Sequence, residues 1–354
     1  MKDQNIMAVV REFEPADLDG VKELRARAFW HATPERLERD ASIWRWLETH
    51  PLAAEHLHRW VLVDGDRIVG FLGAIPQYYR IAGRRVVAHA PGEYMVDSNY
   101  GFHAVLLMRA FFRTVENCVT CDWHPEVLRV QGWLGATDVV DLEAFTKPLT
   151  TAKLPVSLPR PVGAVVNLGL RVVDSILTTG RDRFEIKVLD DFDDRFDRFF
   201  EAVSSQVPCI PEKDVAFLRW RYGESSPHTA SAILAALDGD DLLGYAVLRV
   251  TPTDRAGLMP DVTVLPGRHD VARELVRAAA RYFRRAGATV IWYRFLASPV
   301  GPRPSDVRRL GLIPRKRRPR LQVKFADPEL HQMAVNAANW AFSYGDEEVG
   351  FWDE

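Results

Sequence analysis

The alternation of apolar and polar residues predicts a β-hairpin that occurs twice in the chain. In the first copy, an apolar segment at 60–63 meets the turn Asp64-Gly65-Asp66, and a second apolar segment follows at 68–74. Asp-Gly between two such segments is a strong signal for a tight hairpin turn, because its central residues adopt left-handed backbone angles. The second copy has the turn Asp238-Gly239-Asp240 between apolar segments at 232–237 and 242–250.

Two further similarities place this hairpin within a longer repeated unit. Arg45-Trp46 and Arg219-Trp220 are separated by the same offset as the two hairpin turns. Upstream, each copy begins with a short apolar segment that leads into an amphipathic helix, which ends near residue 29 in the first copy and near residue 203 in the second. Each half is therefore predicted to begin with a strand, two helices and the hairpin.

The remainder of each half repeats a second series of elements. An apolar strand leads into a helix, and then follow a strand, a short helix and a closing strand. In the first half the two strands and the intervening helix are expected at 94–96, 100–115 and 118–123, with the closing strand at 142–146. In the second half the corresponding segments are 261–265, 269–286, 289–295 and 321–325.

The length of 354 residues is consistent with this duplication, since domains of about 100–200 residues predict two of them. The segment after residue 149 is rich in Pro and then helical, which is typical of a connector. We therefore expect an N-terminal domain at 8–149, a connector at 150–183, a C-terminal domain at 184–327 and a tail at 328–354.

Charge narrows the class of partner. Lys plus Arg number 46 and Asp plus Glu number 48, for a net charge of −2, so no overall charge favours nucleic acid, and we expect no nucleic-acid partner. The exception is a local basic run at 315–320. A solvated surface is the simplest interpretation of that run, and CoA phosphates, an anionic glycan or lipid headgroups are the alternatives.

Cysteine content and the N-terminal residues predict a cytoplasmic protein. The three cysteines are too few for a disulfide framework, and residues 1–10 lack the apolar stretch of a signal peptide. No segment reaches the roughly 18 uncharged apolar residues of a membrane span, so we expect no stable membrane insertion. An amphipathic helix at 162–177 has the spacing to lie on a membrane, but its polar face lacks clustered Lys and Arg, which favours packing between the halves.

The order of elements resembles that of the GCN5-related N-acetyltransferase fold. Because the order occurs twice, the chain is similar to bacterial two-domain members associated with polysaccharide and cell-envelope gene sets. Such proteins carry an Arg-Trp-Arg-Tyr segment in the second half, here Arg219-Trp220-Arg221-Tyr222, and end in Asn-Trp and Gly-Asp, here Asn339-Trp340 and Gly345-Asp346. The resemblance covers about residues 8–346 and implies an α+β fold of two tandem domains, each with a central mixed, mostly antiparallel sheet flanked by helices.

The resemblance also implies that acetyl-CoA binds where the central strand of a half leads into the next helix. Free backbone groups of that strand bind the pantetheine arm, and N–H groups at the helix N-terminus bind the pyrophosphate. In the second half, Gly267, Arg268 and Ala272 match this pattern, although Asp270 would repel a pyrophosphate. In the first half, the matching positions are Met95, Val96, Gly101, Phe102, His103 and Ala104.

Transfer of an acyl group to an amine needs a base for the ammonium proton and an acid for the leaving thiolate. Glu93 is the first candidate for the base, because it begins the segment of the central strand whose side chains the fold directs toward the acceptor. Asp97 and His103 are further candidates. The usual Tyr acid is absent from the corresponding helix, so His124 or solvent is the candidate acid.

Other candidate sites carry weaker signals. Asp261 and Tyr293 form the comparable pair of the second half, where a degenerate structural half is the preferred interpretation. Cys118 and Cys121, with His124 nearby, have the spacing of half a zinc site. A separation of three on a strand directs the two thiols to opposite faces, so we expect no metal.

Together these features predict an acyl-CoA-dependent N-acetyltransferase. It would transfer acetyl from acetyl-CoA to an amine of a small molecule or an amino sugar, by direct attack in a ternary complex. The alternative is a non-catalytic binding or scaffold protein of the same fold, with degenerate CoA loops. A homodimer is compatible with either function.

Overall fold

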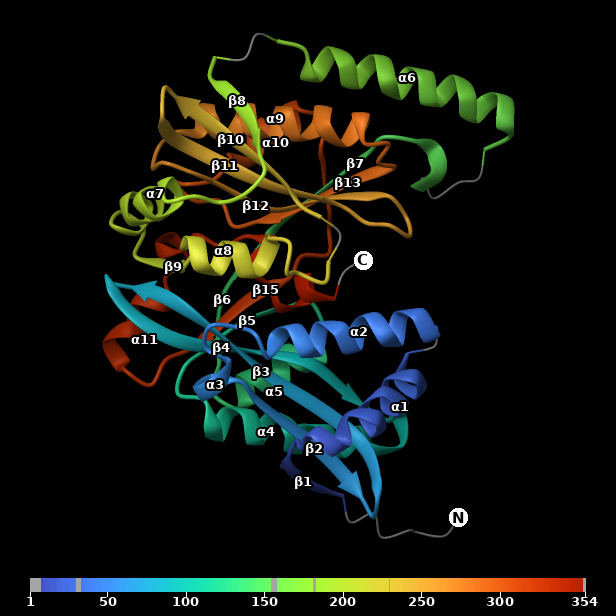
Figure 1. The fold of residues 1–354 in the computed structure, drawn as a ribbon, viewed down its shortest axis with the longest axis vertical. Helices are drawn as coiled ribbons and strands as arrows, with labels where there is room; N and C mark the ends of the chain where they lie inside the picture. Colours follow the sequence, from blue (N-terminus) through green and yellow to red (C-terminus); the bar gives the residue numbers. More distant parts are fainter. Residues whose placement is uncertain (1–7, 30–32, 154–157, 181–182, 229, 353–354) are drawn as a thin grey trace. The chain divides into compact units, whose positions relative to one another are not determined.

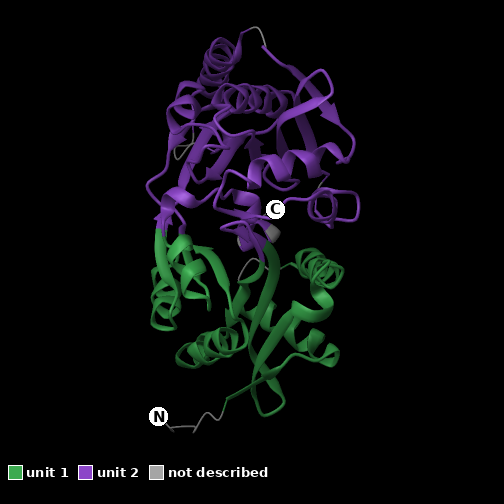
Figure 2. Cartoon of the chain, turned by 90° about the vertical axis from the view of Figure 1, so that its left-hand side faces the viewer, with its two compact units in different colours: residues 1–78, 86–139, 321–335 green, residues 79–85, 140–320, 336–354 purple. Residues whose placement is uncertain are grey.

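The computed structural model describes the chain from residue 8 to residue 352, apart from residues 30–32, 154–157, 181–182 and 229 (Figure 1). Residues 1–7, where no signal peptide is expected, lie outside the described residues. Contacts divide the chain into two compact units, coloured in Figure 2. Unit 1 comprises residues 1–78, 86–139 and 321–335, and unit 2 comprises residues 79–85, 140–320 and 336–354.

Unit 1 is built on a mixed sheet. Its strands are β1 (Val9–Glu12), β2 (His58–Asp64), β3 (Arg67–Ile81), β4 (Arg84–Val96), β5 (Cys118–Asp122), β6 (Thr137–Asp141) and β15 (Arg320–Lys324). They follow the order β1-β2-β3-β4-β5-β15-β6, in which β4 and β5 run parallel and β1, β2 and β3 are antiparallel. Its helices are α1 (Leu18–Ala28), α2 (Pro34–Leu47), α3 (Ala53–His56), α4 (Ala104–Thr114), α5 (Pro125–Trp133) and α11 (Pro328–Ala334).

Alternation along the strands of unit 1 gives its sheet two apolar faces. On one face, Trp60 of β2 contacts Phe111 of α4, with ring centroids 6.4 Å apart. On the other face, Phe71 of β3 contacts Trp44 of α2 at 6.1 Å. Successive strand residues point to opposite faces, so both sides of the sheet are covered by helices.

Unit 2 repeats this architecture. Its sheet contains β7 (Glu143–Pro148), β8 (Glu185–Leu189), β10 (Ala232–Asp238), β11 (Asp241–Val250), β12 (Ala256–Val264), β13 (Val290–Phe295) and β14 (Ile313–Pro314). The order is β14-β7-β13-β12-β11-β10-β8, and β12 with β13 is the parallel pair. The helices are α6 (Arg160–Thr178), α7 (Arg195–Ser204), α8 (Val215–Tyr222), α9 (His269–Arg285) and α10 (Pro304–Arg309), and a short strand β9 (Cys209–Pro211) pairs with the end of β3.

Helix α9 forms the centre of the larger core of unit 2. Val271, Leu275, Ala279 and Phe283 recur every four residues along it and are fully buried. This spacing places their side chains on one face of the helix, against β10, β11 and β12. The opposite face of the sheet is covered by α7, where Phe196 contacts Tyr245 of β11 at 5.2 Å.

Both predicted hairpins are confirmed. Asp64 pairs with Arg67 across one turn, and Asp238 pairs with Asp241 across the other. Gly65 and Gly239 have φ angles of +58° and +61°, the left-handed conformation that favours glycine at these turns. The predicted α+β class, with two mixed sheets flanked by helices, is likewise confirmed.

The closing strands differ from the prediction, which placed 142–146 in the first half and 321–325 in the second. Strand β7 pairs antiparallel with β13 in the sheet of unit 2, from Glu143 opposite Phe295 to Pro148 opposite Val290. Strand β15 lies between β5 and β6 in the sheet of unit 1, so the two closing strands are exchanged (Figure 2). The apolar pattern identifies each as a buried strand but contains no information about which sheet it joins.

Candidate active site

The parallel strands β4 and β5 of unit 1 pair at one end and then separate. His89 of β4 lies opposite Cys118, and its N–H donates to the carbonyl oxygen of Asn117 at 2.9 Å. The Asn117 side chain donates in turn to the carbonyl oxygen of Val87, also at 2.9 Å. Within the described chain, residues 90–96 of β4 have no ladder partner in β5, which leaves backbone groups along the gap available to a ligand.

The residue at the root of this gap is a buried histidine. The ring Nε2 of His89 lies 3.1 Å from the carbonyl oxygen of His56, and its Nδ1 finds no hydrogen-bond partner among the described residues. Burial lowers the pKa of His89 to about 4, and the nearby rings of His58 and His56, at 5.9 and 6.0 Å, act in the same direction. The ring is therefore neutral at neutral pH.

Glu93, the first candidate for the base, lies in β4 on the face that α1 and α2 cover. Its φ angle is +55°, a left-handed conformation that is uncommon for a residue other than glycine. Its carboxylate is 4% exposed and accepts hydrogen bonds from Nη1 of Arg25 and Nε1 of Trp44. Arg25 also pairs with the buried Asp40. Backbone strain of this kind persists where the surroundings fix it, and it clusters at functional sites.

The residues after Glu93 alternate between the two faces of the sheet. The sulfur of Met95 lies 4.0 Å from Nη1 of Arg25, so this side chain shares the face of Glu93. Tyr94 and Val96 instead pack against the apolar cluster that contains α4. Burial raises the pKa of Tyr94 to about 12, so this phenol stays protonated at neutral pH.

A 3₁₀ helix at Ser98–His103 stands where the resemblance implies a pyrophosphate loop. The Asp97 carboxylate caps it by accepting from the N–H of Asn99 at 3.2 Å, and it pairs with Arg67 at 2.9 Å and Arg27 at 3.5 Å. Asp97 therefore has an N-cap and ion-pair role in the structure. Its side chain already binds two cations and one backbone donor.

The residues that follow Asp97 and are predicted to bind the cofactor differ in their surroundings. Phe102 is fully exposed, and the space around the Cα of Gly101 is open. The ring of His103 lies 6.1 Å from that of Tyr100, and Ala104 begins α4. Gly101 and Phe102 are thus accessible to a ligand.

His124, the candidate acid, lies where β5 leads into α5. Its Nδ1 is 2.9 Å from Oδ1 of Asp122, an oxygen that also accepts the backbone N–H groups of Trp123 and His124 at 2.6 and 2.8 Å. The His124 side chain is 56% exposed. A carboxylate at Nδ1 fixes the orientation of the ring, with Nδ1 carrying hydrogen and Nε2 directed away from Asp122.

The structure brings Glu93 and Met95 together beside Arg25, whereas His124 pairs with Asp122 at the end of β5. The sequence prediction missed Arg25, Asp40 and Trp44, which hold Glu93, and Asp122, which orients His124. A signal for the first group exists. Arg25 and Asp40 are charged residues that lie among the buried apolar residues of α1 and α2. A charged residue on the apolar side of a helix is rarely buried without a partner of opposite charge.

The corresponding gap of unit 2 is filled by the C-terminal segment of the chain. Strands β12 and β13 pair only over 256–258 and 290–292, and Ser343 bridges to Phe295 beside them. The buried Nζ of Lys213 lies 3.0 Å from Asp261 and 3.1 Å from Asp346 of this segment. Asp261, the counterpart of Glu93, is thereby fully paired inside the protein.

The remaining candidates show no further site in the part of the chain that the structure describes. Cys118 is buried in the core, and burial raises the pKa of its thiol. No group of three metal-ligating side chains is present among the described residues. In the basic run, Arg318 pairs with Glu143 at 3.4 Å and Arg320 with Asp141 at 2.7 Å.

Two mixed sheets, each with a central parallel pair that separates beside a long helix, define the fold of the GCN5-related N-acetyltransferases. No protein-family model and no curated protein matches the sequence. Among solved structures, a conserved protein of unknown function from Enterococcus faecalis, described as a probable N-acyltransferase, is 12% identical with a TM-score of 0.58, over 92% of this chain and 74% of that one.

Two other solved structures give similar agreement. A GCN5-related N-acetyltransferase from Kribbella flavida is 15% identical with a TM-score of 0.55, over 91% of this chain and 73% of that one. Saccharomyces cerevisiae N-myristoyltransferase with bound myristoyl-CoA is 11% identical with a TM-score of 0.61, over 96% and 90%. The predicted GCN5-related fold is confirmed over about nine-tenths of the chain.

Proposed function

We propose that the protein is an acyl-CoA-dependent N-acyltransferase whose acyl-CoA lies between β4 and β5 of unit 1. The observation that carries this proposal is the separation of these strands beyond His89. The matching gap of unit 2 contains the chain's own residues 343–346, which favours unit 1 as the cofactor-binding unit. Structures of this fold that were solved with an acyl-CoA, such as the N-myristoyltransferase, support the same class of cosubstrate.

The proposed reaction is a direct transfer in a ternary complex. The amine nitrogen attacks the thioester carbonyl carbon, a C–N bond forms and the C–S bond breaks. A backbone N–H of the unpaired part of β4 stabilises the negative charge that develops on the carbonyl oxygen. The ammonium proton passes to a base, and the CoA thiolate takes up a proton as it leaves.

Glu93 and His124 are the proposed base and acid. The carboxylate of Glu93, which Arg25 and Trp44 hold in place, would take up the ammonium proton through a water molecule. Asp122 orients His124 through Nδ1, and the imidazolium form of the ring, which carries its second proton on Nε2, would protonate the thiolate. The proposed acceptor is the amine of a small molecule or an amino sugar in the cytoplasm, and acetyl is the proposed acyl group.

Acyl-CoA binding tests the proposal directly. Calorimetric titration with acetyl-CoA, and separately with myristoyl-CoA, is expected to give saturable heat for at least one of them. Phe102→Asp places a negative charge beside the proposed pyrophosphate position without disturbing the core. Two unit charges about 6 Å apart at the protein surface, where the effective dielectric constant is about 20, repel by about 2.8 kcal/mol, so binding should weaken about a hundredfold.

Ile313→Asp is the matched control, because Ile313 is an exposed apolar residue on β14 of unit 2. Its acyl-CoA affinity should equal that of the unchanged protein. Absence of heat and of any rise in melting temperature, at concentrations well above micromolar, contradicts the enzyme proposal. That outcome favours the non-catalytic binding protein instead.

A further inference from the structure

Helix α6 of unit 2 presents an apolar face to solvent. Six large apolar side chains along it are between 47% and 71% exposed: Val162, Val165, Leu168, Val172, Val173 and Ile176. They occupy one side of the helix, which we call the α6 apolar face. Packing between the halves, the role predicted for this helix from the sequence, stays a prediction, and unit 2 itself leaves these six side chains exposed. Contiguous exposed apolar surface of this kind marks an interaction site.

The other side of α6 is anchored to unit 2 by buried charge. Asp174, the single acidic residue of the helix, is buried and pairs with Lys147 and with Arg284 of α9 at 2.9 Å. Asn167 accepts from the N–H of Thr151 at 2.7 Å. The helix is long and apolar enough to cross a membrane, with 17% of its most apolar stretch buried. Crossing would remove Asp174 from both cations, so α6 stays attached as a surface helix.

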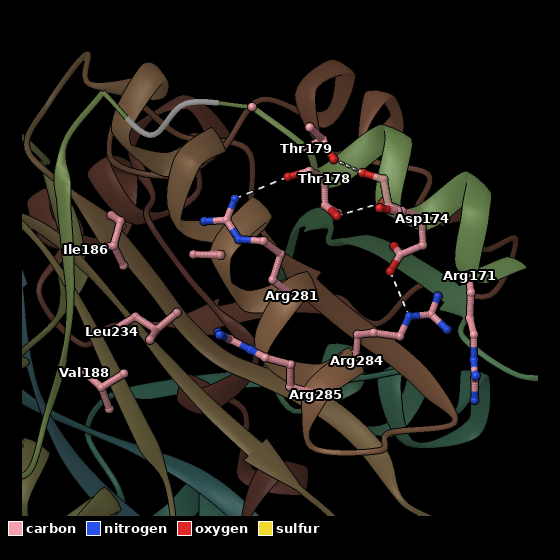
Figure 3. A pocket seen from close by; sticks show the side chains of 13 residues that line it. Arg171, Asp174, Thr178, Thr179, Ile186, Val188, Leu234, Arg281, Arg284 and Arg285 are labelled. Atoms are coloured by element: carbon pink, nitrogen blue, oxygen red, sulfur yellow. Dashed lines mark hydrogen bonds and ion pairs between the residues drawn. The ribbon is translucent and has the colours of Figure 1, made fainter.

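A cationic pocket of about 930 Å³ lies between α6, α9 and the strands β8 and β10 (Figure 3). Arg171 of α6 and Arg281, Arg284 and Arg285 of α9 line it. Arg281 donates to the carbonyl oxygen of Thr178 at 3.2 Å, while Arg285 is exposed. The cationic cluster that the sequence of α6 lacks is therefore supplied mainly by the neighbouring helix.

The floor of the same pocket is apolar. Ile186 and Val188 of β8 and Leu234 of β10 form it, beside the arginines (Figure 3), and Ala278 of α9 also lines the pocket. An apolar floor beside guanidinium groups suits a molecule with an anionic head and a hydrocarbon part. The pocket and the α6 apolar face thus have complementary chemistry for one kind of partner.

We propose that the α6 apolar face and the adjoining arginine pocket dock the protein on an anionic lipid bilayer. A helix lying in the interface buries its apolar face by about 5–10 Å, which is comparable to its own radius. Its opposite half, with Arg171 and the arginines of α9, then lies at the level of the lipid phosphates. The arginines pair with the phosphates while the valines enter the acyl region.

A second copy of the chain fits this surface less well. A twofold pairing of two α6 helices would bring the arginines of both copies together. Asp174, the only acid of the helix, is already engaged by Lys147 and Arg284 and cannot pair with them. The repulsion between these arginines opposes association of two copies. A layer of lipid phosphates instead neutralises the positive charge of the arginines.

Vesicle co-sedimentation of the full chain tests the docking. Vesicles of phosphatidylcholine with about a third phosphatidylglycerol should bind the protein at least tenfold more tightly than vesicles of phosphatidylcholine alone, and 1 M salt should weaken the binding. The double variant Val165→Glu/Val172→Glu should reduce binding at least tenfold. The double variant Arg171→Gln/Arg285→Gln should reduce binding to the anionic vesicles and its salt dependence.

Ile313→Glu is the matched control and should leave vesicle binding unchanged. All substituted side chains are exposed, so each variant should fold like the unchanged protein. An unchanged melting temperature would verify this. Equal binding to both kinds of vesicle, or none, overturns the proposal. A dimer in sedimentation velocity that Val165→Glu/Val172→Glu dissociates, without vesicle binding, assigns the face to a second copy. Glycerol phosphate that raises the melting temperature, again without vesicle binding, assigns the pocket to a soluble anion.

Discussion

At the scale of single residues, Glu93 combines a strained backbone with a buried, ion-paired carboxylate. Arg25 and Trp44 both donate to it, and Arg25 is shared with Asp40. The same side chain therefore holds α1, α2 and β4 together and is the proposed base. Loss of the structural contacts and loss of the base would both lower activity. A test of Glu93 therefore needs a substitution and a control that separate the two roles.

We predict that Glu93→Gln lowers turnover by about a hundredfold or more and leaves acyl-CoA affinity nearly unchanged. In the glutamine side chain an NH₂ group replaces one of the two oxygens that accept from Arg25 and Trp44, so one of these buried donors loses its acceptor. The free energy of unfolding should therefore also fall by about 1–3 kcal/mol. Single-turnover kinetics, calorimetry and urea unfolding measure the three quantities.

Asp40→Asn is the control, because it also weakens a partner of Arg25 but leaves the Glu93 carboxylate in place. It should lower stability by a similar amount with a much smaller loss of turnover. Equal loss of turnover in both variants would show that Glu93 acts through structure alone.

The second residue-scale prediction concerns His89 and pH. Its pKa is lowered to about 4 in the folded protein, against about 6.5 when unfolded. Between these values the unfolded chain binds a proton that the folded chain does not. The stabilisation is thus complete above pH 6.5 and is lost as the pH falls toward 4, by about 3 kcal/mol in total.

His89→Gln should remove this pH dependence while keeping a donor toward the carbonyl oxygen of His56. Urea unfolding of both proteins at several pH values between 4 and 7.5 measures the difference. The stability of the two should converge as the pH falls. Parallel curves across this range would mean that His89 is not the titrating group.

At the scale of elements, periodicity in the sequence was sufficient to locate most helices and strands. The hairpin turns follow from Asp-Gly pairs, and α9 begins at His269, as the apolar spacing predicts. The region around the candidate cofactor loop was less predictable. A helix was expected from residue 100, but the chain forms a 3₁₀ helix at Ser98–His103 before α4, because Asp97 caps it. Such a capping contact depends on side-chain geometry that spacing does not encode.

The two parallel pairs show how one element order gives different sites. The gap of unit 2 is filled by residues near 343–346, through the ion pairs of Lys213 with Asp261 and Asp346. The two carboxylates outweigh the effect of burial and raise the pKa of Lys213, which keeps this amine charged. The sequence motif Gly345-Asp346 was recognisable, but its place in the gap required knowledge of contacts distant in sequence. This filled gap is the element-level reason for assigning the cofactor to unit 1.

At the scale of the whole molecule, the exchange of closing strands makes each half of the sequence depend on the other. Strand β15 lies between β5 and β6, where Gln322 donates to Asp138 at 2.6 Å, and Leu321 and Val323 are fully buried. Strand β7 contributes the buried Phe145 to the core of unit 2. The predicted boundary between residues 149 and 150 therefore separates each sheet from one of its own strands.

We predict that a fragment of residues 8–149 does not fold alone. Without β15 its sheet is interrupted between β5 and β6, and the apolar side of β7 is left in water, at a cost of about 1.5–3 kcal/mol for each large apolar side chain. Far-UV circular dichroism should show a broad thermal transition for the fragment and a cooperative one for the full chain. Addition of residues 150–354 in equal amount supplies β15 and should restore cooperativity. A fragment that melts cooperatively at the temperature of the full chain contradicts this prediction and would support a domain boundary at 149.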